Sequence, residues 1–106
     1  MEETVSLKLV SGEEIIGHNA TLFGKSFLEA LNEDTIVLKD ARTLVMLPNG
    51  DLRLAPVIFS ADKDKQIIIF TRAISAYSID IKTEFLEAYN QSLSPLTLPK
   101  KEIIMG

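Results

Sequence analysis

The sequence predicts a small, mainly β domain, an antiparallel sheet of about five strands followed by one C-terminal helix. From residue 4 to residue 79, apolar residues alternate with polar ones or gather in β-branched runs, as strands require. After Ile79 the apolar spacing changes to the 3.6-residue period of a helix. A chain of 106 residues fits one domain. We assign that domain to residues 1–93 and an extended tail to residues 94–106.

The first elements form a hairpin. Residues 4–9 alternate polar and apolar side chains, residues 11–14 have the composition of a turn, and residues 15–18 resume the strand pattern. Gly17 lies inside this second strand, where glycine usually marks a sharp bend or a close approach of backbones. Residues 19–33 are mixed in character, and they can extend the strand and then form one helical turn.

The next two strands are separated by a turn. Residues 35–38 and 43–47 have the apolar, β-branched composition of one strand that continues through the polar residues between them. Residues 48–51, Pro-Asn-Gly-Asp, favour a tight hairpin turn. Residues 52–59 follow as a strand. Its Pro56 has no N–H to donate, which favours an edge position or a bulge.

The apolar run at residues 67–79 is the most informative segment. It holds thirteen residues without Gly or Pro, and Arg72 is its only full charge. Such a run favours extended structure, and an exposed edge of this kind pairs with another chain. We therefore predict an assembly edge whose subunit interface is formed by apolar residues of the run: Ile67, Ile69, Phe70, Ile74 and Tyr77.

A helix is predicted over residues 80–93. Its apolar positions 81, 85, 86, 89 and 93 share one helical face. Asp80 is the expected N-cap, and the Ser-Pro pair at residues 94–95 is the expected end.

Composition restricts the class of protein. The net charge is −4, which argues against broad coating of duplex DNA, because cationic side chains must neutralise the phosphates. The chain has no cysteine, so disulfides and thiolate nucleophiles are excluded, as suits a reducing compartment. No apolar run approaches the roughly 20 residues of a membrane helix, and the first residues are acidic rather than basic. We expect a cytoplasmic protein with no membrane partner.

Catalytic chemistry has little support in the sequence. His18 is the only histidine, so no pair of histidines can hold zinc or build a triad. Glu13 and Glu14 are adjacent, and adjacent residues of a strand point to different faces. We therefore predict no enzyme, no metal site and no cofactor. An enzyme that uses Glu13 or Glu14 with His18 is the remaining alternative.

Arg72 admits two interpretations. It can lie at a strand end, facing solvent or an aspartate across an interface. It can also line a pore, where its planar guanidinium stacks on bases or binds phosphate.

Two segments resemble the Sm/LSm family. Residues 9–17 together with residues 36–41 resemble its first signature, with glycines at Gly12 and Gly17. Residues 69–79 are similar to the second signature, which consists of an apolar strand, an Arg-Gly pair and a short apolar strand, with Ala73 where the family usually has glycine. The resemblance implies a strongly bent five-stranded sheet, and rings of about five to seven identical subunits joined edge to edge.

The resemblance also implies RNA-binding positions. Arg72 matches the arginine of the second signature. Counting back from Leu38 places Thr35 at the base-contacting position and Glu33 at the base-stacking position, and Asn32 is close enough to substitute. A glutamate cannot stack as an aromatic ring does, and it repels phosphate. The distance from Gly17 to Leu38 indicates an enlarged loop.

Two functions follow from this reading. The first is a ring that binds single-stranded RNA, in the manner of an RNA chaperone, without catalysis. The alternative is a homo-oligomeric adaptor that has lost RNA binding and contacts a protein partner through residues 19–33, the C-terminal helix or the tail. Small Sm-like proteins also occur in bacteriophages, and a compact, divergent chain fits that source.

Overall fold

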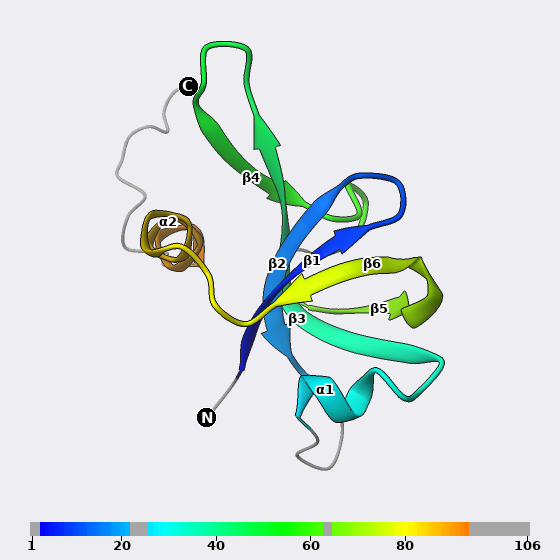
Figure 1. Ribbon diagram of the computed structural model, residues 1–106. Helices are drawn as coiled ribbons and strands as arrows, with labels where there is room; N and C mark the ends of the chain where they lie inside the picture. The colour runs from blue at the N-terminus through cyan, green and yellow to red at the C-terminus, as the bar shows by residue number, and fades with distance from the viewer. Residues whose placement is uncertain (1–2, 22–25, 63–64, 94–106) are drawn as a thin grey trace.

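The computed structural model describes residues 3–21, 26–62 and 65–93, and it confirms a mainly β fold with a C-terminal helix (Figure 1). One antiparallel sheet holds all the strands. The elements in chain order are β1 (Thr4–Leu9), β2 (Glu14–Asn19), α1 (Phe27–Ala30), β3 (Thr35–Met46), β4 (Leu52–Pro56), β5 (Gln66–Phe70), the 3₁₀ turn η2 (Thr71–Ala73), β6 (Ile74–Ser78) and α2 (Thr83–Leu93).

The described residues form six strands rather than about five, because the apolar run at residues 67–79 is split in two. The turn η2 interrupts it and is held to the loop before β3. The Thr71 N–H donates to the carbonyl oxygen of Asp34 at 2.9 Å, and the Thr71 hydroxyl donates to the carbonyl oxygen of Glu33 at 2.8 Å. The continuous extended run expected from composition is therefore wrong: the chain turns at Thr71 and leaves one strand on each side, the arrangement that the resemblance of residues 69–79 implied.

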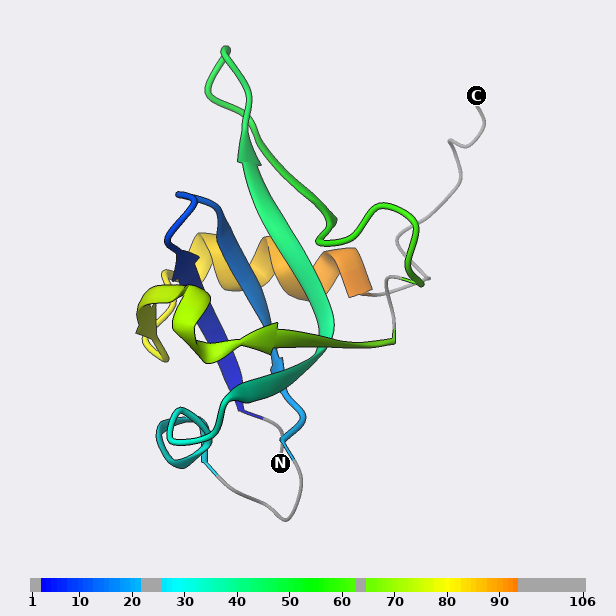
Figure 2. The ribbon, with the colours of Figure 1, turned by 90° about the vertical axis from the view of Figure 1, so that its right-hand side faces the viewer.

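These two strands join the sheet on opposite sides of β2. The strand path runs β4-β3-β2-β1-β6, and β5 pairs with β3. β5 therefore pairs with the second strand of this path and β6 with the fourth, on opposite sides of β2, although only three residues connect them. The sheet must curl for this connection to close, and Figure 2 shows the strong bend of β3, with β5 beside its first half.

A β-bulge produces the bend in β3. Ile16 pairs with Arg42 and His18 with Lys39, so two residues of β3, at 40 and 41, lie opposite the single Gly17 of β2. A Cβ atom on Gly17 would lie 3.3 Å from the Cα of Ala41. The close approach predicted at Gly17 is confirmed, and the extra residue bends the strand, as bulges do.

The bulge also changes which side chains of β3 face inward. Before it, Ile36 and Leu38 are fully buried inside the curled sheet. Ala41, within the bulge, belongs to the same core, and Arg42 directly after it is also buried. The main core inside the sheet is closed at one end by α1 and consists of Val5, Leu7, Ile15, Phe27, Ala30, Ile36, Leu38, Ala41, Ile67 and Ile69.

The helix α2 covers the other face of the sheet. Tyr89 has no exposed surface, and its hydroxyl donates to the carbonyl oxygen of Asp40, at the bulge, at 2.9 Å. Its ring meets the His18 ring edge-on, with centroids 5.3 Å apart. Ile16 is buried on β2 but lies outside the main core cluster. A second, smaller apolar layer therefore lies between the sheet and α2.

The structure corrects the start of this helix. α2 begins at Thr83, whereas Asp80 was predicted as the N-cap. The Asp80 N–H instead donates to the hydroxyl of Ser78 at 3.0 Å, in a turn that leads away from β6. The predicted apolar face is confirmed, since Tyr89 is buried and Phe85 is half-buried.

The remaining turns follow the sequence signals. Ser26 and Glu29 form a capping box that starts the single turn α1, as expected for residues 19–33. Gly50 adopts φ +91° in the hairpin turn between β3 and β4. Residues 94–106, the predicted tail, lie outside the described residues. Within the described part of the chain, no helix has the length and apolarity to cross a membrane.

Candidate functional site

The turn η2 forms a corner of the chain, with β5 before it and β6 after it, and each of these two strands has an open edge. Within the described residues β5 pairs only with β3, and β6 pairs only with β1. Each of these strands therefore leaves one edge of backbone N–H and C=O groups without a strand partner, and such edges are templates for pairing with another chain. Ile68 on β5 is 66% exposed and Ile79 just after β6 is 54% exposed.

The predicted interface residues divide between the core and the surface. Ile67 and Ile69 are buried in the chain's own core, and Ile74 packs against that core. Phe70 and Tyr77 are 55% and 40% exposed. The side chains of Ile67 and Ile69 therefore support the fold, and these two residues can serve an assembly only through their backbone.

The predicted RNA-binding residues come together at this corner. Thr35 is the register partner of Phe70, which directly precedes η2. The bonds from Thr71 hold the loop that carries Asn32 against η2. Arg72 is exposed, and its guanidinium carbon lies 5.1 Å from the centroid of the Phe70 ring. One cation, one amide and one aromatic ring thus share a single corner of the chain.

The charge of the corner is not favourable to phosphate. Glu33 and Asp34 belong to the loop that Thr71 holds, and both are exposed. Two carboxylates therefore accompany the single guanidinium of Arg72. Phosphate binding depends on neutralisation by cationic side chains.

The possible catalytic residues are not brought together. Glu14 and His18 lie four residues apart on β2, which corresponds to about 13 Å along a strand. His18 Nδ1 lies 3.0 Å from the Thr4 hydroxyl, and its ring packs on Tyr89. No group of three or more possible metal ligands is found within the described ranges.

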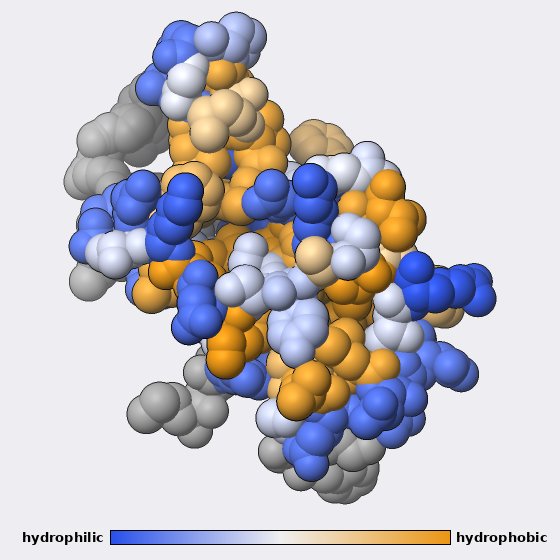
Figure 3. All heavy atoms as spheres, in the orientation of Figure 1, coloured by the Kyte–Doolittle hydropathy of each residue, from blue (hydrophilic) through white to orange (hydrophobic). Residues whose placement is uncertain are grey.

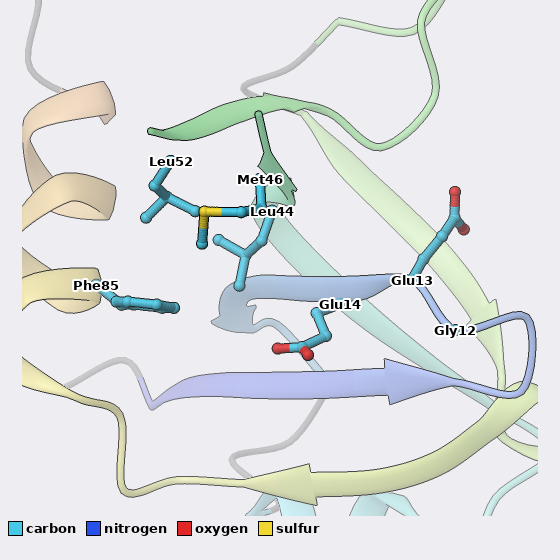
Figure 4. Close-up of a pocket in the computed structure, with 7 residues that line it drawn as sticks. All are labelled: Gly12, Glu13, Glu14, Leu44, Met46, Leu52 and Phe85. Carbon is cyan, nitrogen blue, oxygen red and sulfur yellow. The ribbon is translucent and has the colours of Figure 1, made fainter. Parts of the chain in front are cut away.

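A shallow cavity of about 180 Å³ lies between α2 and the β3–β4 hairpin. Its lining combines apolar side chains from the hairpin and from α2 with the two glutamates Glu13 and Glu14. Figure 4 shows Phe85 pointing into it from α2 and Met46 and Leu52 from the hairpin, while the Glu14 carboxylate turns toward this space and the Glu13 carboxylate turns away. Of the possible catalytic residues, Glu13 and Glu14 line this cavity and His18 does not.

Among the described residues, the most exposed aromatic residue was not predicted as a site residue. Residues 52–59 were predicted as one strand, but β4 ends at Pro56, and Phe59 lies beyond it with 95% of its surface exposed. Proline cannot donate to the ladder, and that signal was sufficient to end the strand earlier. Further apolar surface occurs on the β3–β4 hairpin, below its polar tip, in Figure 3, and Met46 is 60% exposed there.

No family model matches this chain, and no curated protein matches it.

Proposed function

We propose that this protein is a self-assembling, Sm-like scaffold subunit whose copies join by pairing β5 of one copy with β6 of the next. The observation that carries the proposal is the pair of open edges on β5, which pairs with β3, and on β6, which pairs with β1, in one curled sheet. An interface between two different edges of the same chain is heterologous, and it generates a closed ring when the rotation between copies closes.

The inward and outward side chains of β5 and β6 indicate which residues of the two strands would pair between copies. β5 and β6 each have five residues, so full antiparallel overlap places Ile67 opposite Tyr77 and Ile68 opposite Ala76. Residues directly opposite share a face of the sheet. Ile67 is buried in the core, and Tyr77 packs inward on the core residue Phe27 with ring centroids 5.0 Å apart.

The second pair agrees with the first. Ile68 is exposed on the outer face, and Ala76 is exposed opposite the exposed Lys8 of β1. Both pairs therefore match inward with inward and outward with outward. A slip of one residue would oppose inward to outward side chains, and a slip of two would leave strand residues unpaired. The proposal therefore specifies full overlap, a register that a crosslink can test.

The crosslink uses the absence of cysteine from the chain. The double variant Ile68→Cys/Ala76→Cys puts one thiol on each edge, and directly opposite residues are close enough for a disulfide. Mild oxidation is expected to give a ladder of covalent oligomers on a denaturing gel. The ladder ends at the ring size, because a closed ring has no thiol left.

Each single-cysteine variant is the matched control, because one thiol per chain allows no species larger than a dimer. Light scattering coupled to size exclusion gives the mass of the unmodified protein in parallel. A monomeric mass at every concentration, together with a double variant that forms no ladder, would rule out the scaffold.

Single-stranded RNA binding is the second candidate function. The specific observation in its favour is the corner that joins Arg72, Asn32 and Thr35, which assembly would repeat once per subunit. Arginine and aromatic side chains stack on unpaired bases, a contribution of about 1–3 kcal/mol per base. The carboxylates of Glu33 and Asp34 oppose it.

Arg72→Ala is expected to abolish binding of U-rich or A-rich oligomers at low salt, measured by fluorescence anisotropy, while the mass of the assembly stays unchanged. Lys8→Ala, which removes an exposed cation from β1, is the control for charge alone. An assembled protein that binds neither oligomer, or whose affinity does not depend on Arg72, excludes the RNA role and favours the adaptor that contacts a protein partner.

A further inference from the structure

The cavity between α2 and the β3–β4 hairpin combines an apolar surface with negative charge. Its apolar part consists of Leu44, Met46 and Leu52 on the sheet and Phe85 on α2. Its charged part consists of Glu13 and Glu14, and no cation is among the described residues that line it. Because a few polar groups in an apolar site determine which ligand it accepts, a matching ligand has an apolar body and a positive charge.

Glu14 is the residue that presents this charge to the cavity. It lies two positions before Ile16 on β2, so the two side chains lie on the same face of the sheet. Ile16 is buried in the layer beneath α2, whereas Glu14 is exposed. Figure 4 shows the Glu14 carboxylate turned toward the side of the cavity on which Phe85 lies, and the Glu13 carboxylate turned away. The cavity therefore has one carboxylate beside its apolar surface.

Phe85 adds an aromatic ring that already attracts a cation. The Lys82 ammonium lies 5.9 Å from the centroid of this ring, within the range of about 6 Å for cation–π contacts. The ring is half-buried and lines the cavity. A carboxylate and an aromatic ring together favour a guanidinium over an ammonium group. The planar guanidinium forms two parallel hydrogen bonds to a carboxylate and stacks on aromatic rings.

The size of the cavity indicates what kind of molecule carries the guanidinium. Its volume of about 180 Å³ is below the roughly 300–1,000 Å³ of pockets that hold whole small molecules. A single side chain fits it better, and arginine is among the most frequent anchors of protein interfaces. The methylene stem of an arginine covers apolar surface while its charged head stays at the rim. Met46, which is 60% exposed, offers further apolar surface to residues beside the arginine.

We propose that this cavity binds an arginine side chain of a partner protein, with the guanidinium on the Glu14 carboxylate and the stem against Phe85 and Met46. The partner is a protein rather than a nucleic acid, because the two glutamates repel phosphate. The cavity lies within one copy of the chain, so the contact does not depend on the β5–β6 assembly. It adds a partner-binding surface to the proposed scaffold.

A peptide titration tests the site. The probe is the acetylated and amidated peptide Gly-Ser-Leu-Arg-Leu-Ser-Gly, and the same peptide with glutamine in place of arginine is its control. In an NMR titration at low salt, the arginine peptide is expected to shift the amide signals of Glu14, Met46 and Phe85. Failure of the arginine peptide to bind, or equal binding of the glutamine peptide, would overturn the proposal.

Glu14→Gln removes the charge that the site depends on. It is expected to weaken binding of the arginine peptide about tenfold, because a charge-assisted hydrogen bond becomes a neutral one. Glu13→Gln is the matched control: it is the adjacent residue, is also exposed and carries the same substitution, but its carboxylate turns away. Equal weakening by the two variants would indicate general attraction between opposite charges and would overturn the site.

Lys8 provides an independent test. It is the exposed register partner of Glu14 on β1, and it lines a neighbouring hollow of about 200 Å³ that shares Glu14 with the cavity. Directly opposite residues of a sheet interact, so Lys8 competes with the arginine for the carboxylate. Lys8→Ala is therefore expected to tighten binding about threefold. Lys65→Ala, which removes an exposed cation directly before β5, is expected to have no effect. Equal effects of the two variants would overturn the role of Glu14.

Two further measurements test other occupants of the cavity. Light scattering without peptide is expected to give the same mass for the unmodified protein and for Glu14→Gln. A lower mass for the variant would assign the cavity to a contact between copies and overturn the partner. The double variant Lys100→Ala/Lys101→Ala is expected to leave peptide affinity unchanged, and a tenfold gain would assign the cavity to the chain's own residues 94–106. The cysteine ladder tests the β5–β6 assembly separately.

Discussion

Ile69→Lys is expected to unfold the chain. Ile69 is only 8% exposed and pairs with Ile36, which is fully buried in the core inside the curled sheet. A lysine at this position must either bury its ammonium group without a partner or push the strand out of the core. The cost of several kcal/mol is comparable with the whole stability of a small domain, about 5–15 kcal/mol.

Far-ultraviolet circular dichroism and urea denaturation measure this effect. Ile68→Lys is the matched control: it is the adjacent residue, carries the same substitution and is 66% exposed. It is expected to keep the folded spectrum and a denaturation midpoint close to that of the unmodified protein. A cooperative transition of normal midpoint for Ile69→Lys would contradict the buried position of this side chain.

Tyr89→Ala is expected to release α2 from the sheet. The side chain is fully buried, contacts His18 and hydrogen-bonds to the Asp40 carbonyl at the bulge of β3. Truncating a buried aromatic side chain costs about 3–5 kcal/mol through lost contacts and the remaining cavity. The hydroxyl itself contributes a smaller part, about 1 kcal/mol for one hydrogen bond.

Tyr89→Phe separates these two contributions, because it retains the ring and removes only the donor. We expect a small decrease in the free energy of unfolding for Tyr89→Phe and a large one for Tyr89→Ala. Hydrogen exchange is expected to show loss of protection across α2 only in the alanine variant. Equal losses in both variants would mean that the hydroxyl, rather than the packing of the ring, holds the helix.

The strand pattern could be predicted from sequence because it depends on local properties. The β1–β2 hairpin, the turn before β4 and the apolar face of α2 follow from alternation, from the Asn-Gly signal and from helical spacing. The close approach at Gly17 was also predictable, since few other reasons place a glycine inside a strand.

The errors arose where a contact distant in sequence overrides local preference. The β-branched run at residues 67–79 favours an extended chain, but the bonds from Thr71 to Glu33 and Asp34 turn it into two strands. These partners are more than thirty-five positions away, at separations of 38 and 37. The spacing of apolar residues within residues 67–79 does not indicate these distant hydrogen bonds.

The candidate site shows the same division. Sequence identified Arg72 as the exceptional charge and indicated an assembly edge, whereas only the structure shows which side chains that edge presents. Ile67 and Ile69 alternate with Ile68 and Phe70 along β5, and the pattern alone does not tell which set faces inward. Phe59 was missed because its exposure depends on where β4 ends.

The sequence by itself determined the composition of the elements: short β strands, tight turns and one amphipathic helix, all set by interactions within a few residues. Only the tertiary structure decided the curl of the sheet and the split of the apolar run into two strands. It also decided which side chains of β5 face the core. The bulge opposite Gly17 and the anchoring of Thr71 join residues far apart in the chain. Such contacts form only when the whole sheet closes, so local preference does not encode them.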